Sequence, residues 1–138
     1  MSEKGMRKTV VKALRPLDAI AVENPAYPGT PDVNGIEFWI ELKWASSWPG
    51  ANHRPLRIPH FTRQQKLWLT KRWSMGGAVY LLLKVGQEWL LFEGDTAALV
   101  VGEGTRDKLR ASAICTWQKR LNSSQLVEIL KNGRSKLS

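Results

Sequence analysis

Apolar side chains first recur at helical spacing near the start of the chain. Within residues 3–15, Met6, Val10 and Leu14 fall on one side of a helix. Pro16 has no amide hydrogen to donate and clashes with the preceding turn, so it ends this segment. The pattern therefore predicts a short helix before Pro16.

Extended segments follow this helix. Residues 18–24 (DAIAVEN) have the composition of a strand, and residues 30–44 (TPDVNGIEFWIELKW) predict a hairpin. We expect a two-residue type I′ turn at Asn34-Gly35, because these residue types tolerate the positive φ angles of that turn. After the turn, the even positions 36–42 are all apolar and would form one face of the strand. The odd positions form the other face, so Glu41 and Lys43 lie on the same face.

The middle of the chain predicts a loop, a helix and two more strands. Residues 45–60 contain three prolines and no usable period, which indicates a long loop. Residues 62–74 predict a helix that stops before a Gly-Gly pair. Residues 78–85 (AVYLLLKV) are almost continuously apolar, as in strands that are buried on both faces. A turn then leads into a second strand at residues 88–93.

The last third of the chain predicts helices. Gly94-Asp95 is expected to end the preceding hairpin, and residues 105–121 and 124–131 predict two helices. The order of elements is then helix, three strands, helix, two strands and two helices. This order predicts a mixed α/β layer fold in a single domain over residues 1–138, without repeats or linkers.

Composition agrees with one globular domain and excludes several classes of protein. The chain has 138 residues, of which 43% are hydrophobic and 24% charged. The single cysteine, Cys115, excludes an internal disulfide and a cysteine-based zinc site. The basic first fifteen residues lack the apolar stretch of a signal peptide, and no apolar run has the length of a membrane span. We therefore expect a cytoplasmic protein that does not enter a membrane.

The charge is strongly positive but unevenly distributed. The chain has 21 Lys and Arg against 12 Asp and Glu, a net charge of +9, which favours nucleic acid as a partner before an anionic membrane surface. From Pro16 to His53, however, the only Lys or Arg is Lys43, and five acids fall in this stretch: Asp18, Glu23, Asp32, Glu37 and Glu41. An acidic pocket inside a basic rim would repel a phosphodiester unless a divalent cation bound there.

Three residues of the expected hairpin are candidates for that chemistry. Two carboxylates that converge, here Asp32 and Glu41, are the ligands that Mg²⁺ prefers. A lysine beside them, Lys43, could orient or deprotonate an attacking water and offset charge on the phosphate. Counted from the Asn34-Gly35 turn, Glu41 lies beyond the position that pairs with Asp32. Convergence therefore requires the first strand to begin late or to bend at Pro31.

These residues also form a known motif. The sequence Gly29-Thr30-Pro31-Asp32, followed by Glu41-Leu42-Lys43, resembles the signature of the PD-(D/E)xK nuclease superfamily. Within that superfamily the chain is most similar to the small stand-alone VRR-NUC-type nucleases of phages and bacteria. Those proteins often have a glutamine at the start of the next helix, a tryptophan three residues later and a glycine pair before the next strand. Here these are Gln65, Trp68 and Gly76-Gly77.

The resemblance covers residues 4–93 and implies a fold and an activity. It implies the restriction-endonuclease-like fold, with an αβββαβ core, a mixed sheet flanked by helices, and residues 94–138 as a C-terminal extension. It implies a DNA endonuclease that depends on Mg²⁺, with Mn²⁺ as a substitute, in a bacterial or phage-infected cell. By resemblance its substrate would be branched DNA such as a Holliday junction, handled by a homodimer. The candidate dimer surfaces are the first helix (Met6, Val10, Leu14) and the tail helix around Leu126 and Ile129.

The resemblance and the charge pattern together define the candidate site residues. Asp32 and Glu41 would bind the metal, and Lys43 and Gln65 would assist catalysis. Glu23 is either an additional metal-facing acid or a partner of a nearby cation. Gln65 has a second reading too, because residues 62–65 (TRQQ) fit a helix capping box. The candidate DNA-binding residues are Arg54, Arg57, Arg63, Lys66, Lys71 and Arg72.

Two other functional classes compete with the nuclease. A nucleic-acid-binding module could keep this fold without significant cleavage, although intact Asp32, Glu41 and Lys43 argue against it. A basic structural protein, with Glu41 and Lys43 as a surface ion pair, would leave the acidic stretch unexplained. Nothing in the pattern distinguishes DNA from RNA as the substrate.

Overall fold

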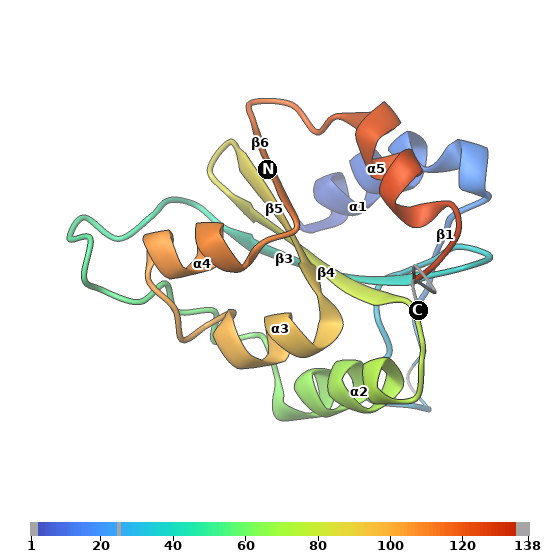
Figure 1. Cartoon of the computed structure of the whole chain (residues 1–138), viewed down its shortest axis with the longest axis horizontal. Coiled ribbons are helices and arrows are strands. Elements are labelled where there is room, and N and C mark those ends of the chain that lie inside the picture. Colours follow the sequence, from blue (N-terminus) through green and yellow to red (C-terminus); the bar gives the residue numbers. More distant parts are fainter. Residues whose placement is uncertain (1–2, 25, 135–138) are drawn as a thin grey trace.

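The computed structural model describes residues 3–24 and 26–134, which form a six-stranded sheet with helices on both faces (Figure 1). The strands are β1 (Ile20–Ala21), β2 (Val33–Asn34), β3 (Trp39–Ala45), β4 (Val79–Val85), β5 (Glu88–Glu93) and β6 (Cys115–Gln118). The helices are α1 (Glu3–Ala13), α2 (Arg63–Ser74), α3 (Gly94–Val100), α4 (Arg106–Ser112) and α5 (Ser123–Leu130), with a short 3-10 helix, η1 (Arg15–Leu17).

The strands lie in the sheet in chain order, from β1 to β6. Only β3 and β4 are parallel, and α2 connects them; every other neighbouring pair is antiparallel. All seven residues of β4 are buried, as the apolar run predicted. The α–β–β–β–α–β order of the first six main elements agrees with the expected core, and the mixed α/β class is confirmed.

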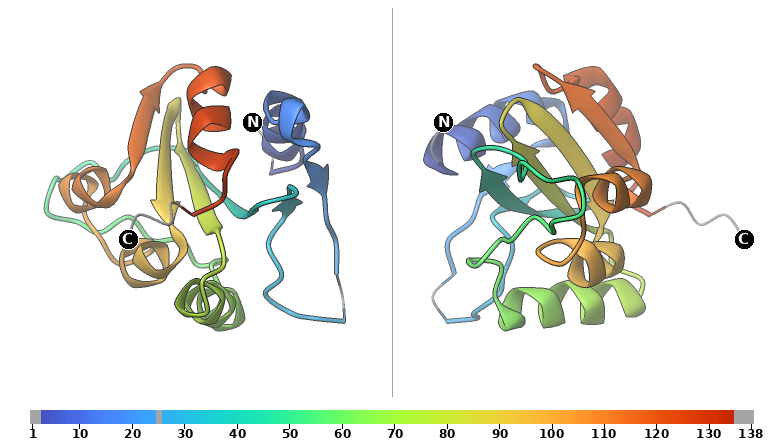
Figure 2. Two further views of the ribbon diagram at one scale, coloured as in Figure 1. Left: turned by 45° about the vertical axis from the view of Figure 1, so that its right-hand side comes forward. Right: turned by 90° about the vertical axis from the view of Figure 1, so that its left-hand side faces the viewer.

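Two hydrophobic clusters bind the helices to opposite faces of the sheet. Figure 2 shows α1 and α5 on one side and α2, α3 and α4 on the other. The α1/α5 cluster includes Leu82, Leu91 and Trp117 from the sheet, whereas the opposite cluster includes Leu81 and Leu90. Full burial of each such side chain contributes about 1.5–3 kcal/mol to folding. Successive side chains of β4 and β5 therefore point alternately into the two clusters.

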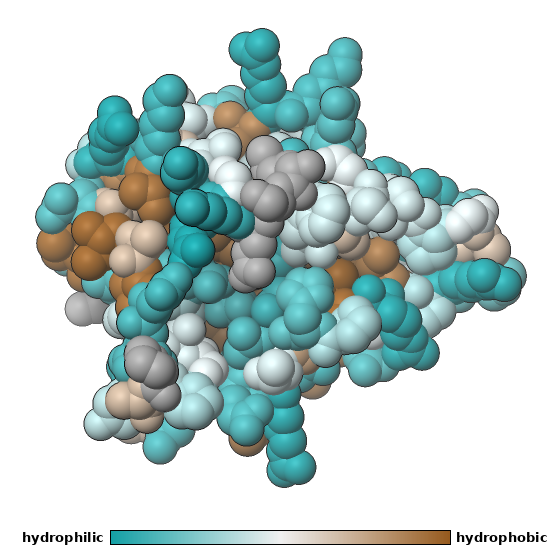
Figure 3. Space-filling view, turned by 180° about the vertical axis from the view of Figure 1, so that it is seen from behind, coloured by the Kyte–Doolittle hydropathy of each residue, from teal (hydrophilic) through white to brown (hydrophobic). Residues whose placement is uncertain are grey.

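The expected dimer surface is not available at the surface of the molecule. Met6, Val10 and Leu14 of α1 and Leu126 of α5 are fully buried in the core, and Ile129 packs against the same cluster. These residues therefore stabilise the monomer. The exposed large apolar residues are Ile20, Tyr27, Ile36, Leu67, Met75, Leu99 and Ile114. From behind, the molecule shows mainly hydrophilic side chains with small apolar areas (Figure 3).

The predicted hairpin is present, but its turn is longer than expected. β2 pairs with β3 so that Val33 lies opposite Ile40 and Asn34 opposite Trp39. Asn34 is therefore a strand residue, and a four-residue connection follows it. Gly35 has no positive φ angle; its missing side chain makes room for the Phe38 ring, which would lie 2.2 Å from an added Cβ. The type I′ turn was a wrong prediction because this glycine serves packing.

The C-terminal region is also different from the predicted pair of helices. Gly94 begins α3, and residues 105–121 contain α4, a short break and then β6, which pairs with β5 at the edge of the sheet. Only α5 agrees with the prediction for this region. Ala97, Leu109 and Trp117 belong to the two hydrophobic clusters, so the C-terminal extension contributes to the core.

The long loop between β3 and α2 is connected to the rest of the structure by a buried carboxylate. Glu88, 5% exposed, accepts two hydrogen bonds from Arg110 at 2.7 and 2.8 Å and one from the Trp48 indole at 3.0 Å. Further along, Leu56, Ile58 and Phe61 are buried. The bond to Glu88 and these buried side chains therefore anchor the loop to the rest of the structure. None of the described helices has the length and apolar character needed to cross a membrane.

Candidate active site

The hairpin brings the two predicted carboxylates together. Because Val33 pairs with Ile40, the preceding residue Asp32 lies across from Glu41, which follows Ile40. The Asp32 side chain accepts a hydrogen bond from the Leu42 backbone N–H at 2.9 Å, which holds its carboxylate against β3. β2 begins directly after Pro31-Asp32, and the longer connection at residues 35–38 sets the register that brings Asp32 opposite Glu41.

Gly29 allows the segment before Asp32 to approach α2. Its φ angle is +93°, in the region that favours glycine. An added Cβ would lie 2.6 Å from the backbone oxygen of Gln64. The glycine of the Gly-Thr-Pro-Asp sequence therefore has a physical role, since a larger residue would move the Asp32 segment away from the helix.

Glu41 and Lys43 form a buried ion pair on the face of β3 that α2 covers. Their exposed fractions are 1% and 3%, and Lys43 Nζ lies 3.1 Å from Glu41 Oε2. Lys43 also donates to the backbone carbonyl oxygen of His60 at 3.0 Å. Glu41 Oε1 is buried and accepts no hydrogen bond from the described residues. A buried carboxylate oxygen in this state is costly, and a bound cation would offset the cost.

The environment strongly disfavours a charged Glu41. Burial raises the pKa of Glu41 to about 8, and the negative charge of Asp32 acts in the same direction, whereas Lys43 lowers it. Desolvation and a second carboxylate are the two usual causes of such an increase. Without a cation, the site therefore tends to hold a proton on Glu41.

This pKa predicts how the metal-free protein responds to pH. Between pH 4.5 and about 8, folded Glu41 holds a proton that the unfolded chain releases, so the free energy of unfolding should fall as pH rises through this window. The expected loss is on the order of a few kcal/mol. Glu88 acts in a different window: burial opposes its ionisation, but bonds from Arg110 and Trp48 lower its pKa, so its contribution is lost only below pH 4.5.

Thermal unfolding in EDTA at pH 5, 6.5 and 8 measures the effect. Glu41→Gln should remove most of the pH dependence, while Glu37→Gln, at an exposed glutamate, should leave it unchanged. Adding Mg²⁺ should restore stability at pH 8 in the wild type but not in Glu41→Gln. Equal pH dependence in the two variants would contradict the assignment of the raised pKa to Glu41.

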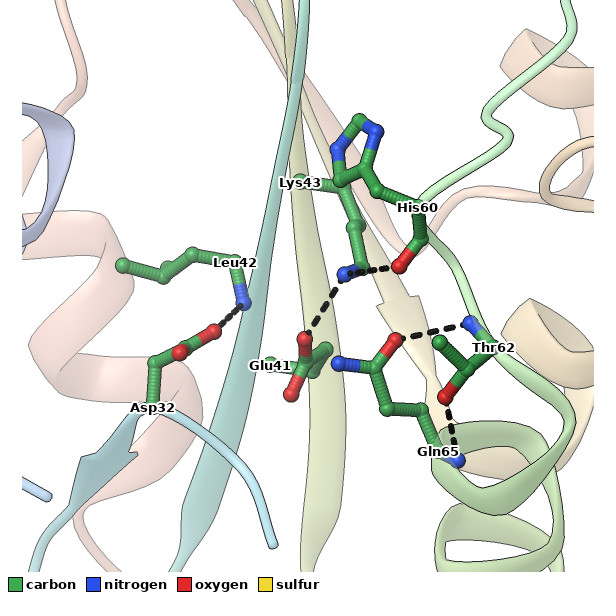
Figure 4. A network of polar contacts seen from close by, with 7 residues as sticks. All are labelled: Asp32, Glu41, Leu42, Lys43, His60, Thr62 and Gln65. Atoms are coloured by element: carbon green, nitrogen blue, oxygen red, sulfur yellow. Dashed lines mark hydrogen bonds and ion pairs between the residues drawn. The ribbon is translucent and has the colours of Figure 1, made fainter. Parts of the chain in front are cut away.

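Gln65 takes part in the capping box and also faces the site. The side-chain oxygen of Gln65 accepts a hydrogen bond from the Thr62 backbone N–H at 2.9 Å, and the Gln65 backbone N–H donates to the Thr62 hydroxyl at 3.2 Å. This leaves the side-chain nitrogen directed toward Glu41 (Figure 4). The capping contact is thus present, and it fixes the orientation in which the amide group faces the carboxylates.

Glu23 follows Val22, whose N–H donates to the Asp32 carbonyl oxygen at 2.8 Å, but among the described residues Glu23 joins no group of three acids that could hold a metal. Glu23 is exposed and lies 3.4 Å from Arg7 of α1, so it has the alternative role of partner to a cation. His60 was not among the predicted site residues, yet its backbone carbonyl oxygen accepts a hydrogen bond from the Lys43 ammonium. No residue-type signal could have identified that oxygen, because every residue carries one.

The candidate DNA-binding residues lie on the loop and on α2. Arg54, Arg63, Lys71 and Arg72 are exposed, and Arg72 stacks on the Trp68 ring at 4.5 Å. Arg57 pairs with Glu103 at 3.1 Å, and Lys66 lies 5.3 Å from the centre of the Phe61 ring. The four residues of α2 give a basic surface on the helix that covers Glu41, whereas Arg57 contacts the segment between α3 and α4.

Asp32 and Glu41 are the side chains that could hold a metal here. Both offer hard oxygen donors, and Glu41 Oε1 is buried without a hydrogen-bond partner among the described residues, while burial and the Asp32 charge raise the pKa of Glu41. These features fit a divalent cation such as Mg²⁺. Over residues 3–24 and 26–134, no group of three or more His, Cys, Asp or Glu is arranged to hold a metal. Water and a phosphate oxygen would have to complete its coordination.

Comparison with known proteins identifies the fold. No protein-family model matches this chain, and no curated protein matches it in sequence. Among solved structures it is similar to the 1.6 Å structure of Hjc, a Holliday junction resolvase from the archaeal hyperthermophile Archaeoglobus fulgidus. The TM-score is 0.53 at 20% identity, over 81% of this chain and 94% of that chain. The chain therefore has the mixed α/β, restriction-endonuclease-like fold of this resolvase.

Proposed function

We propose that the protein is a Mg²⁺-dependent DNA endonuclease that hydrolyses phosphodiester bonds, with selectivity for branched DNA such as Holliday junctions. The observation that carries the proposal is the convergence of Asp32, Glu41 and Lys43 beside α2, with an unpaired, buried oxygen on Glu41. Such a group, a half-buried Asp32 beside a buried Glu41–Lys43 pair, has no evident structural use. A hydrophobic replacement would stabilise the fold at least as well.

The chemistry divides between the cation and the side chains. Bound Mg²⁺ would supply a Lewis acid for the phosphate and would lower the pKa of a water molecule. Asp32, held by the Leu42 N–H, and Glu41 would bind it. Lys43, fixed by Glu41 and by the His60 carbonyl, would orient the attacking water and offset the charge that develops on the phosphate. The Gln65 amide, fixed by the capping box, would position the same water.

Charge favours a nucleic-acid substrate, and the likeness in fold to a resolvase favours branched DNA. The basic residues on α2 and its preceding loop would contact phosphates, which position a duplex without reading its sequence. The similar Archaeoglobus fulgidus protein is a Holliday junction resolvase. Because one site cuts one strand, resolution of a junction needs two copies related by a two-fold axis, and we include this symmetric dimer in the proposal.

Cleavage assays test the proposal. The protein is incubated with labelled four-way junction, flap, linear duplex and structured RNA, each with Mg²⁺, with Mn²⁺ or with EDTA. We expect metal-dependent paired nicks in the junction, faster than cleavage of linear duplex, and light scattering at micromolar concentration should give the mass of a dimer. Tight junction binding without cleavage in either metal would instead establish a binding module. Preference for linear duplex by a monomer would contradict the resolvase reading.

A further inference from the structure

A hollow lined by basic and apolar residues lies on the α1/α5 face of the sheet, opposite the carboxylate cluster. It has a volume of about 590 Å³ and lies between α1, the end of β4, β5 and the β6–α5 connection. Its basic residues are Lys12, Lys84, Lys119 and Arg120. None of the described residues that line it is acidic. We propose that this hollow binds a phosphate group.

Lys84 and Trp89 form the floor of this site. Lys84 of β4 pairs with Trp44 of β3, the residue that follows Lys43. Because side chains alternate along a strand, Lys84 lies on the face of the sheet opposite Lys43. It is only 8% exposed, and its ammonium lies 4.9 Å from the centre of the Trp89 ring. A lysine in the middle of a sheet is expensive to bury, because its charge loses water.

Trp89 adds an unused hydrogen-bond donor. Its side chain is 2% exposed, and its indole N–H is buried without an acceptor among the residues that the structure describes. Buried polar groups are almost always paired, so an indole N–H in this state points to a ligand that supplies the acceptor. An acceptor with negative charge fits this N–H best, because the Lys84 ammonium lies beside the same ring.

Lys119 provides a second, independent sign of function. Its φ angle is +66°, in the left-handed region where a residue with a side chain is strained. Glycine or asparagine would adopt this backbone more readily, so the lysine side chain is retained at a cost to stability. Lys119 and Arg120 are both exposed and line the mouth of the hollow together with Lys12. They can reach a ligand that Lys84 contacts from below.

Phosphate is the anion that fits these groups. Its oxygens accept several charge-assisted hydrogen bonds at once, which suits an assembly of separate ammonium and guanidinium groups with one N–H donor. The phosphate could belong to a nucleic-acid backbone or to a free phosphate compound. The site lies on the other face of the sheet from the proposed catalytic cluster, so its existence does not depend on cleavage.

Nitrogen NMR of the indole groups tests the proposal in the full chain. The Trp89 indole resonance, assigned with Trp89→Phe, is followed in EDTA at constant ionic strength during titration with inorganic phosphate and, separately, with a short DNA duplex. We expect a saturable shift. A shift with inorganic phosphate alone identifies a free phosphate compound as the source, and a shift with the duplex identifies a backbone phosphate.

Matched variants separate a built site from general positive charge. Lys119→Gly removes the strained side chain, so the protein should remain folded with equal or higher stability, yet bind the shifting ligand at least about tenfold more weakly. Lys84→Met should weaken binding similarly. Lys108→Ala removes an exposed charge on α4 and should have no effect. The proposal is overturned if neither ligand gives a saturable shift, or if Lys108→Ala weakens binding as much as Lys119→Gly.

Discussion

Asparagine at position 32 is expected to lower the rate of junction cleavage by at least about a thousandfold, because a metal ligand contributes several kcal/mol of charge stabilisation in the transition state. Asp32→Asn is a sharper change than Asp32→Ala. The amide oxygen can still accept the hydrogen bond from the Leu42 N–H, so the hairpin keeps its geometry while the charge is lost. Asp32→Ala should be equally inactive but less stable.

Three further measurements show whether this loss is catalytic. Junction affinity in EDTA should remain within a few-fold of the wild type, because basic residues supply the phosphate contacts and Asp32 is not one of them. The thermal stability of metal-free Asp32→Asn at pH 8 should be equal to that of the wild type or higher, since the Asp32 charge disfavours ionised Glu41. Asp18→Asn, the same change at an exposed acid, should retain full activity. Cleavage by Asp32→Asn at the wild-type rate would end the assignment of the site.

Sequence reasoning succeeded where local signals and the final structure agree. α2 begins at a Thr62 cap with the Gln65 capping box, and both are visible in the residue types alone. β4 is buried on both faces, as its continuous apolar run indicated. The mixed α/β class and the restriction-endonuclease-like core followed from these elements and from the Pro-Asp and Glu-x-Lys motif.

The errors share a physical cause in the use of glycine. Gly35 was interpreted as a turn residue, but it makes room for the Phe38 ring, and this shifts the pairing of the hairpin. Gly94 was interpreted as the end of a hairpin, but it begins α3, where an added Cβ would lie 2.7 Å from a Val79 methyl group. Close packing against a side chain, whether three residues away as for Gly35 or distant as for Gly94, leaves no signal in the residue type, so a glycine that serves it resembles a turn glycine in the sequence.

The register error had a direct consequence for the site. With a turn at Asn34-Gly35, Asp32 and Glu41 would not have been opposite each other; with the observed pairing of Val33 and Ile40 they are. β6 was missed for a related reason, because its four residues are extended only by pairing with the edge of β5. The chemical identity of the site was thus readable from the motif, whereas its geometry depended on long-range packing.

Methionine at position 43 is expected to slow the chemical step by about a hundred- to a thousandfold, the usual effect of removing one group that stabilises transition-state charge. Methionine fills most of the volume of the lysine, so no large cavity forms. Because Lys43 lowers the pKa of Glu41, its removal should also make Glu41 hold its proton more strongly, and more Mg²⁺ should be needed for half-maximal activity. Raising Mg²⁺ should correct the second effect but not the first.

Affinity for DNA should change little in Lys43→Met, because Lys43 is 3% exposed and its ammonium already contacts Glu41 and the His60 carbonyl. Lys71→Met provides the opposite case. Loss of this exposed lysine on α2 should weaken DNA binding and reduce the dependence of binding on salt. The single-turnover rate at saturating protein should stay near that of the wild type. Single-turnover cleavage and binding in EDTA, measured for both variants, separate the two roles. If Lys43→Met lost affinity but kept the wild-type single-turnover rate, Lys43 would be a phosphate contact and the catalytic role proposed for it would be wrong.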